Sequence, residues 1–143
     1  AVDVPLCREL VAAAGPLGIT FHRAFDAARD LPAAMEQVID LGCQRILSSG
    51  GAASAIAGGP VLRQLATQAA GRIRLMAGAG LDAANIANVA AQSGCDELHA
   101  SAKSVRLSAM RHHNPSLVGL ENDWVQSDVE RVSALRRALD QAG

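Results

Sequence analysis

The sequence has very few aromatic residues and no concentration of basic ones. It contains two phenylalanines, one tryptophan and no tyrosine among 143 residues, although 50% of the residues are hydrophobic. The core is therefore expected to be aliphatic. The formal net charge is −1, and no basic stripe with interleaved aromatics is present, which argues against nucleic acid as a partner.

Long apolar runs and paired cysteines are also lacking. No stretch approaches the roughly 20 apolar residues that a membrane helix needs, and no secretory signal is visible, so we expect no membrane partner. Cys7, Cys43 and Cys95 are too few and too scattered for a disulfide framework, and no CxxC pair exists. These cysteines are expected to be small buried side chains in a reducing, cytoplasmic protein.

What the sequence does contain is a repeated strand-helix unit. Ile19, Ile46 and Ile73 lie at even spacing near the starts of short strand-like runs, and a fourth run covers residues 97–101. The helical stretches are bounded by start and stop signals. Asp30 with Pro32 begins one helix and Gly42 ends it, and Asp82 begins another that Gly94 ends. Ser127 and Glu130 form a capping box at the start of the last helix. Short strands alternating with amphipathic helices predict a parallel α/β sheet in a single domain.

Alternation along the four strands predicts one apolar face toward the helices and one polar face. Because a parallel sheet normally buries both faces, the polar face indicates a barrel lumen. Arg45, Arg74 and Glu97 would form a charged layer near the barrel floor. Residues 103–126 are expected to form a long irregular loop that is either functional or disordered.

Several ordered segments resemble the signatures of the CutC family of copper-homeostasis proteins. They are T-F-H-R-A-F-D at 20–26, R-I-L-S-S-G at 45–50, M-A-G-A-G at 76–80 followed by Asn85, E-L-H-A-S at 97–101, and Met110, Arg111 and Asn114 in an M-R-x-x-N stretch. The resemblance implies a TIM (β/α)8 barrel of which residues 1–143 form a part, strands five to eight, with the N-terminal half missing. It also implies a cytoplasmic copper-homeostasis protein that binds copper. The family's copper cysteines belong mainly to the missing half, so no metal ligand is assigned here.

In barrels of this kind, the functional residues lie at the C-terminal ends of the strands. The candidates for acid-base chemistry are His22, Arg23, Asp26, His99 and Ser101. The candidates for anion binding are Ser49, Gly50, Gly78 and Gly80, because glycine loops expose backbone N–H groups to a ligand. Structural roles stand beside these: barrel turns need glycine, and histidines also form hydrogen bonds inside a lumen.

Two functions therefore remain open from the sequence. The first is copper binding, which the family resemblance implies. The second is an enzyme that acts on a small phosphorylated or anionic metabolite at the strand ends. Because four parallel strands leave two unpaired edges, we also expect a homo-oligomer or pairing with a missing half.

Overall fold

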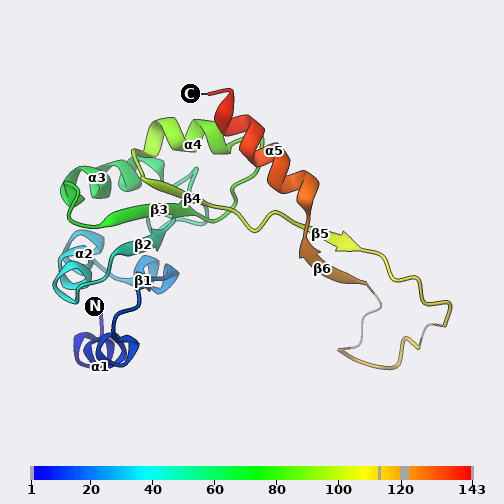
Figure 1. Ribbon diagram of the computed structural model, residues 1–143, viewed down its shortest axis with the longest axis horizontal. Helices are drawn as coiled ribbons and strands as arrows, with labels where there is room; N and C mark the ends of the chain where they lie inside the picture. Colours follow the sequence, from blue (N-terminus) through cyan, green and yellow to red (C-terminus); the bar gives the residue numbers. More distant parts are fainter. Residues whose placement is uncertain (1, 113, 120–122, 143) are drawn as a thin grey trace.

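The centre of the molecule is a parallel sheet. The computed structural model describes residues 2–112, 114–119 and 123–142. Its four-stranded sheet has the order β1-β2-β3-β4, with the bounds β1 (Thr20–Phe21), β2 (Arg45–Ser48), β3 (Arg74–Gly78) and β4 (Glu97–His99) (Figure 1). All three strand pairs are parallel, as the alternating pattern predicts.

Helices connect the strands and cover one face of the sheet. The helical elements are α1 (Val4–Ala14), the 3-10 helix η1 (Arg23–Ala27), α2 (Leu31–Asp40), α3 (Gly59–Ala69), α4 (Ile86–Ser93) and α5 (Val129–Asp140). Ile46 and Leu75 point toward this layer and are 0% and 1% exposed. They pack with Met35 and Val38 of α2 and Leu65 of α3. The predicted apolar face is thus confirmed.

The start and stop signals of α2 behave as predicted. The Asp30 side chain accepts a hydrogen bond from the Ala33 N–H at 3.0 Å and caps the helix, and Pro32 lies in its first turn. Gly42 follows the helix with φ +80°, a left-handed conformation that costs an L-residue about 1–2 kcal/mol and costs glycine little.

Two other predicted helix starts are displaced, that of α4 by three residues and that of α5 by one. Asp82 does not cap α4; its carboxylate accepts from the Ala84 and Asn85 N–H groups in a separate turn, and the helix begins at Ile86. The cap of α5 is Asp128, which accepts from the Glu130 and Arg131 N–H groups, because strand β6 extends through Ser127 and leaves it outside the helix start.

The predicted loop at 103–126 contains a hairpin instead. Strands β5 (Lys103–Arg106) and β6 (Trp124–Ser127) pair antiparallel, and Figure 1 shows them directed away from the sheet. We call residues 103–127 the arm and residues 2–101 the body. Within the described ranges, no helix combines the length and hydropathy needed to cross a membrane.

Candidate functional site

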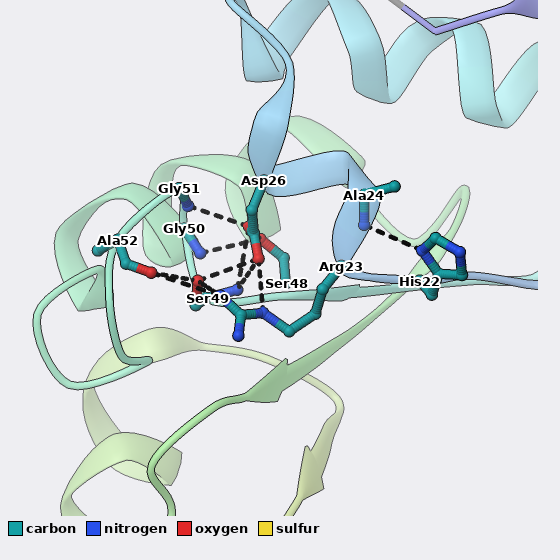
Figure 2. A network of polar contacts seen from close by, with 9 residues as sticks. All are labelled: His22, Arg23, Ala24, Asp26, Ser48, Ser49, Gly50, Gly51 and Ala52. Atoms are coloured by element: carbon teal, nitrogen blue, oxygen red, sulfur yellow. Dashed lines mark hydrogen bonds and ion pairs between the residues drawn. The ribbon is translucent and has the colours of Figure 1, made fainter.

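A buried carboxylate organises the C-terminal ends of β1 and β2 (Figure 2). Helix η1 follows β1 and brings Asp26 under the loop that leaves β2. Its Oδ1 accepts from the Ser48 hydroxyl at 2.6 Å and the Gly51 N–H at 3.0 Å, and its Oδ2 accepts from the Ser49 N–H and hydroxyl, both at 3.0 Å. Arg23 Nε donates to Oδ2 at 2.9 Å. We call these five residues the Asp26 network.

The Asp26 network keeps its carboxylate ionised. Burial alone would raise the pKa of Asp26, whose side chain is 9% exposed. The hydrogen bonds from Ser48, Gly51, Ser49 and Arg23 oppose burial, and the net pKa lies below its ordinary value. With both oxygens already accepting, Asp26 serves as an anchor in this arrangement, and neither His22 nor His99 is hydrogen-bonded to it.

Two backbone N–H groups of the glycine loop after β2 donate to acceptors inside the protein. Gly51 donates to Asp26, and the Gly50 N–H donates to the Ser48 hydroxyl at 2.9 Å. The Gly50 and Gly51 N–H groups thus donate within the protein, and the binding of an external anion by Ser49, Gly50, Gly78 and Gly80 stays a prediction. An anion at this loop would have to rely on the guanidinium of Arg23, whose side chain is 43% exposed.

Close backbone contact holds the same loop in place. Gly50 has φ +70°, and a Cβ there would lie 2.5 Å from the Gly58 carbonyl oxygen. A Cβ on Gly58 would lie 1.8 Å from the Ser49 carbonyl oxygen. The two glycines let the start and end of the 49–58 segment touch, which positions Ser49 for its bonds to Asp26.

The second glycine loop is tied to its neighbours in a similar way. Ala79 and Gly80 both have positive φ, +89° and +73°. The Ala79 carbonyl accepts from the Ala55 N–H at 3.0 Å, and the Gly80 carbonyl accepts from Asn85 Nδ2 at 3.0 Å. Gly78 lies in β3, where a Cβ would meet the Leu47 side chain at 2.7 Å. These glycines at least serve the local packing.

The two candidate histidines lie on opposite edges of the sheet. His22 follows β1, and its Nδ1 accepts from the Ala24 N–H at 3.0 Å, which caps η1. His99 ends β4 beside Gly78. Three strand spacings of about 4.8 Å separate β1 from β4, so the sheet does not bring the two imidazoles together.

Ser101 lines a different pocket, with basic residues that the sequence analysis missed. This pocket of about 440 Å³ lies beyond β4, and Lys103 and Arg131 line it together with Ser101 and Asp82. Arg131 comes from α5, far along the sequence, and no local motif marks it.

The charged layer at the N-terminal ends of the strands is confirmed. Arg45 Nη2 donates to Glu97 Oε1 at 2.8 Å, and Arg74 Nη1 lies 3.6 Å from the same oxygen. The hydrogen bond from Arg45 lowers the pKa of Glu97. These residues form an ion pair network on the sheet face opposite the helices.

Two of the three cysteines, which the sequence analysis describes as scattered along the chain, line the same pocket. Cys7 and Cys43 both line a pocket of about 460 Å³ between α1 and β1, and His22 lies at its wall. Burial raises the pKa of Cys43, and charge on Cys7 raises it further. Cys43 is buried as expected, whereas Cys7 and Cys95 are half-buried.

Metal chemistry at these residues is limited by the number of donors. Among the described residues, no group of three or more His, Cys, Asp or Glu side chains is placed to hold a metal ion. Zinc sites in proteins almost always have three or four protein ligands. The thiols of Cys7 and Cys43 instead suit a soft ion such as Cu(I).

Comparisons with known proteins agree with one another. A family model described as the CutC family matches residues 1–104. A protein of Chromobacterium violaceum named a family protein CutC is 49% identical over 147 residues, covering 99% of this chain and 59% of that protein. A protein of Pasteurella multocida with the same name is 42% identical over 144 residues, covering 97% and 59%. The chain thus spans 59% of the length of these curated relatives.

A solved structure is also similar. It is the "Putative Copper Homeostasis Protein CutC" of Streptococcus agalactiae, which aligns with a TM-score of 0.65 and 28% sequence identity. The alignment covers 68% of this chain and 49% of that one.

Proposed function

The chain belongs to the CutC family, and from this we propose that it takes part in copper homeostasis in the cytoplasm and binds Cu(I) through two cysteine thiols. The name of the solved relative from Streptococcus agalactiae supports the copper assignment. The cytoplasmic location is supported by Cys7, Cys43 and Cys95, which are all free thiols.

The observation that carries the copper proposal is the pocket that Cys7 and Cys43 share. Thiolates are preferred ligands of Cu(I). Burial, and to a smaller extent charge on Cys7, raises the pKa of Cys43, and a bound cation would offset both effects. Binding would release a proton from each thiol that is protonated beforehand. The remaining walls of the pocket are mainly aliphatic, which suits a soft ion better than a hard one.

A Cu(I) competition titration against a chromophoric chelator, under reducing conditions, tests this proposal. We expect Cys7→Ala and Cys43→Ala to weaken Cu(I) binding by at least about 100-fold, because losing a ligand costs more than the 10–100-fold loss seen for supporting residues. Cys95→Ala is the matched control and should bind like the unmodified chain. Circular dichroism checks that Cys43→Ala, at a buried position, is still folded.

Two results would contradict the copper proposal. If the unmodified chain does not compete with the chelator at all, the chain does not bind Cu(I). If all three variants bind equally well, copper binds elsewhere and the thiol pair is not its site.

We propose further that the sheet is part of a (β/α)8 barrel, with residues 1–143 as one partial domain. Two observations support this interpretation. Among the described residues, no strand pairs with the outer edge of β1 or β4, and the charged face carries Arg45 and Glu97. A barrel removes both edges, because each strand then has two neighbours. The match of this chain to 49% of a solved relative is consistent with a half-barrel.

A second candidate function is an enzyme for a small phosphorylated or anionic metabolite at the strand ends. The observation that favours it is the guanidinium of Arg23. Its Nε and Nη2 donate to Asp26 and to the Ser49 hydroxyl, at 2.9 and 2.7 Å, which fixes its orientation. Its Nη1 has no hydrogen-bond partner among the described residues and is available to a phosphate or carboxylate oxygen.

Calorimetric titration with inorganic phosphate tests this second function. Phosphate should bind to the unmodified chain, and Arg23→Ala should abolish the heat of binding. Arg136→Ala on α5 removes the same charge at a remote, 76% exposed position and should leave binding unchanged. If Arg23→Ala and Arg136→Ala bind phosphate with equal affinity, Arg23 does not contribute to the phosphate site.

A further inference from the structure

The pocket beyond β4 is formed by three segments that are separated in the sequence. Its volume of about 440 Å³ is within the range of small-molecule sites in proteins, and it is lined by residues 81–84, residues 101–103 and one side of α5. We call it the Lys103 pocket. The chain runs past it twice, on leaving β4 for the arm and on returning from the arm into α5 (Figure 1). The described residues that line it include no member of the Asp26 network.

Two positively charged side chains meet at the Lys103 pocket. Lys103 belongs to β5 and Arg131 to α5, and both are exposed. Within the described part of the chain, neither the Lys103 ammonium nor the Arg131 guanidinium pairs with a carboxylate. By contrast, Arg23, Arg45 and Arg72 each pair with a carboxylate of the protein. The donors at the pocket are therefore available to an external anion.

Asp128 holds the backbones of these two residues beside the same opening. Its N–H donates to the Ala102 carbonyl at 2.8 Å, and its carboxylate accepts from the Ser104 hydroxyl at 2.7 Å. The same carboxylate accepts from the Arg131 N–H at 3.4 Å in the first turn of α5. Because Ala102 and Ser104 flank Lys103, one aspartate fixes the start of the arm against the start of the helix.

The backbone between Ser101 and Lys103 is strained. Ala102 has φ +46°, a left-handed conformation that is unfavourable for a residue with a Cβ. This turn comes directly after β4 and lets both Ser101 and Lys103 line the pocket. Strained backbone of this kind is concentrated at functional sites, where the surrounding contacts maintain it.

An aliphatic wall lies inside the charged opening. Leu81 is 8% exposed and packs in a core cluster with Ile86 and Val89, and Leu135 of α5 is half-buried against the same cluster. Both leucines line the pocket. A ligand that consists of an anionic group alone would leave this wall in contact with water, whereas an aliphatic chain would cover it.

The charge of the Lys103 pocket suits a ligand with one negative charge. Lys103 and Arg131 contribute two positive charges and the Asp82 carboxylate contributes one negative charge, so the net charge is +1. Asp82 already accepts from the Ala84 and Asn85 N–H groups, at 2.9 and 3.1 Å. A carboxylate matches this balance better than a phosphate monoester, which carries nearly two negative charges at neutral pH.

We propose that the Lys103 pocket binds a small aliphatic carboxylate. Arg131 and Lys103 donate to the carboxylate oxygens, and the Ser101 hydroxyl donates to one of them. The aliphatic chain of the ligand lies against Leu81 and Leu135. The site is separate from the thiol pocket and from Arg23, so it does not depend on either function proposed above.

A ligand-observed NMR titration with hexanoate tests this proposal. From the binding energy that is usual for each non-hydrogen atom of a small ligand, we expect a dissociation constant of about 1 mM or below. Lys103→Ala and Arg131→Ala should each weaken binding by about 10-fold or more, because each removes a charge-assisted hydrogen bond. Arg106→Ala on β5 and Arg137→Ala on α5 are the matched controls. They remove the same charge from the same elements at exposed positions outside the pocket, and should bind hexanoate like the unmodified chain.

Two further ligands separate the roles of charge and apolar surface. Acetate keeps the carboxylate but lacks the aliphatic chain, so it should bind about 10-fold or more weakly than hexanoate. Inorganic phosphate, which has no apolar part, should not displace hexanoate. Arg23→Ala should leave hexanoate binding unchanged, which distinguishes this site from the phosphate site proposed at Arg23.

Three results would overturn the proposal. The first is no binding of hexanoate at concentrations well above the expected dissociation constant. The second is equal binding by the Lys103→Ala and Arg131→Ala variants and their controls, which would place the ligand elsewhere. The third is acetate binding as tightly as hexanoate, which would mean that the aliphatic wall is not used. Far-UV circular dichroism should be the same for all four variants, because all four side chains are exposed.

Discussion

The body and the arm of this chain differ in how their side chains are held. In the body, Ile46 and Leu75 are almost completely buried between sheet and helices, and the carboxylate of Asp26 accepts hydrogen bonds at both oxygens. In the arm, Val118 is 98% exposed and the two strands contact mainly each other. Buried apolar contacts and hydrogen bonds within one copy stabilise the body, whereas the described side chains of the arm make few contacts of this kind.

This difference predicts where a substitution acts. A change in the body removes contacts that exist in every folded copy, so it lowers the free energy of unfolding. The same type of change in the arm removes few contacts within the copy and should lower that free energy much less. Matched substitutions in the two regions therefore test the distinction directly.

The largest effect is expected from Gly58→Ala. A Cβ at this position would lie 1.8 Å from the Ser49 carbonyl oxygen, which is backbone and cannot rotate away. We expect a loss of about 3 kcal/mol in the free energy of unfolding, at the upper end of the usual overpacking cost. The measurement is urea denaturation followed by circular dichroism.

Gly119→Ala in the arm is the control for that substitution. Gly119 has φ +82°, but a Cβ there would meet nothing within 4 Å. Only the left-handed conformation is penalised, by about 1 kcal/mol, and that loss is confined to the arm. Equal losses for Gly58→Ala and Gly119→Ala would mean that the contact between the ends of the 49–58 segment does not stabilise the body.

Asp26→Asn should have the next largest effect. The amide keeps the shape of the side chain, but it replaces one accepting oxygen with a donor. At Oδ2 this donor would face the N–H and hydroxyl of Ser49 and the Arg23 guanidinium. At Oδ1 it would face the Ser48 hydroxyl and the Gly51 N–H. The buried donors left without an acceptor, and the loss of the charge that pairs with Arg23, are expected to lower the free energy of unfolding by about 2 kcal/mol.

Asp123→Asn makes the same change in the arm. Asp123 accepts from the Ser108 N–H at 2.9 Å in an exposed position, where an amide oxygen can replace the carboxylate. The expected loss is below about 1 kcal/mol. If both asparagine variants unfold at the same urea concentration, the Asp26 network contributes no more than an exposed hydrogen bond.

The sequence predicted the sheet well because its signals are local. Strand positions follow from the alternation around Ile46 and Ile73, and the start of α2 follows from Asp30 and Pro32. The charged layer of Arg45, Arg74 and Glu97 was predictable because alternate residues of a strand lie on one face of the sheet and paired positions on adjacent strands share that face.

The features that the sequence did not predict depend on contacts between distant segments. The Gly51 N–H points toward Asp26 because of the path of the whole loop after β2. Cys7 and Cys43 share a pocket because of the way α1 packs beside β1. The hairpin was missed because its strands lie far apart in sequence, with no short turn motif between them.

The smallest effect tests whether the stabilising contacts of the body extend to its surface. The hydrogen bond from Arg72 lowers the pKa of Glu36 from its ordinary 4.5 to about 2, with a further contribution from Gln68. A carboxyl group whose pKa is lowered in the folded state stabilises the protein above its unfolded pKa, and this stabilisation is lost as the pH falls. The unmodified chain should therefore unfold at a higher urea concentration than Glu36→Gln above pH 4.5, and the difference should shrink between pH 4.5 and 2.

Because both side chains of the pair are more than 40% exposed, the difference in urea midpoint should be small and should decrease with added salt. A difference that stays constant across this pH range, or that persists in an Arg72→Ala background, would show that Glu36 acts through packing and not through its charge.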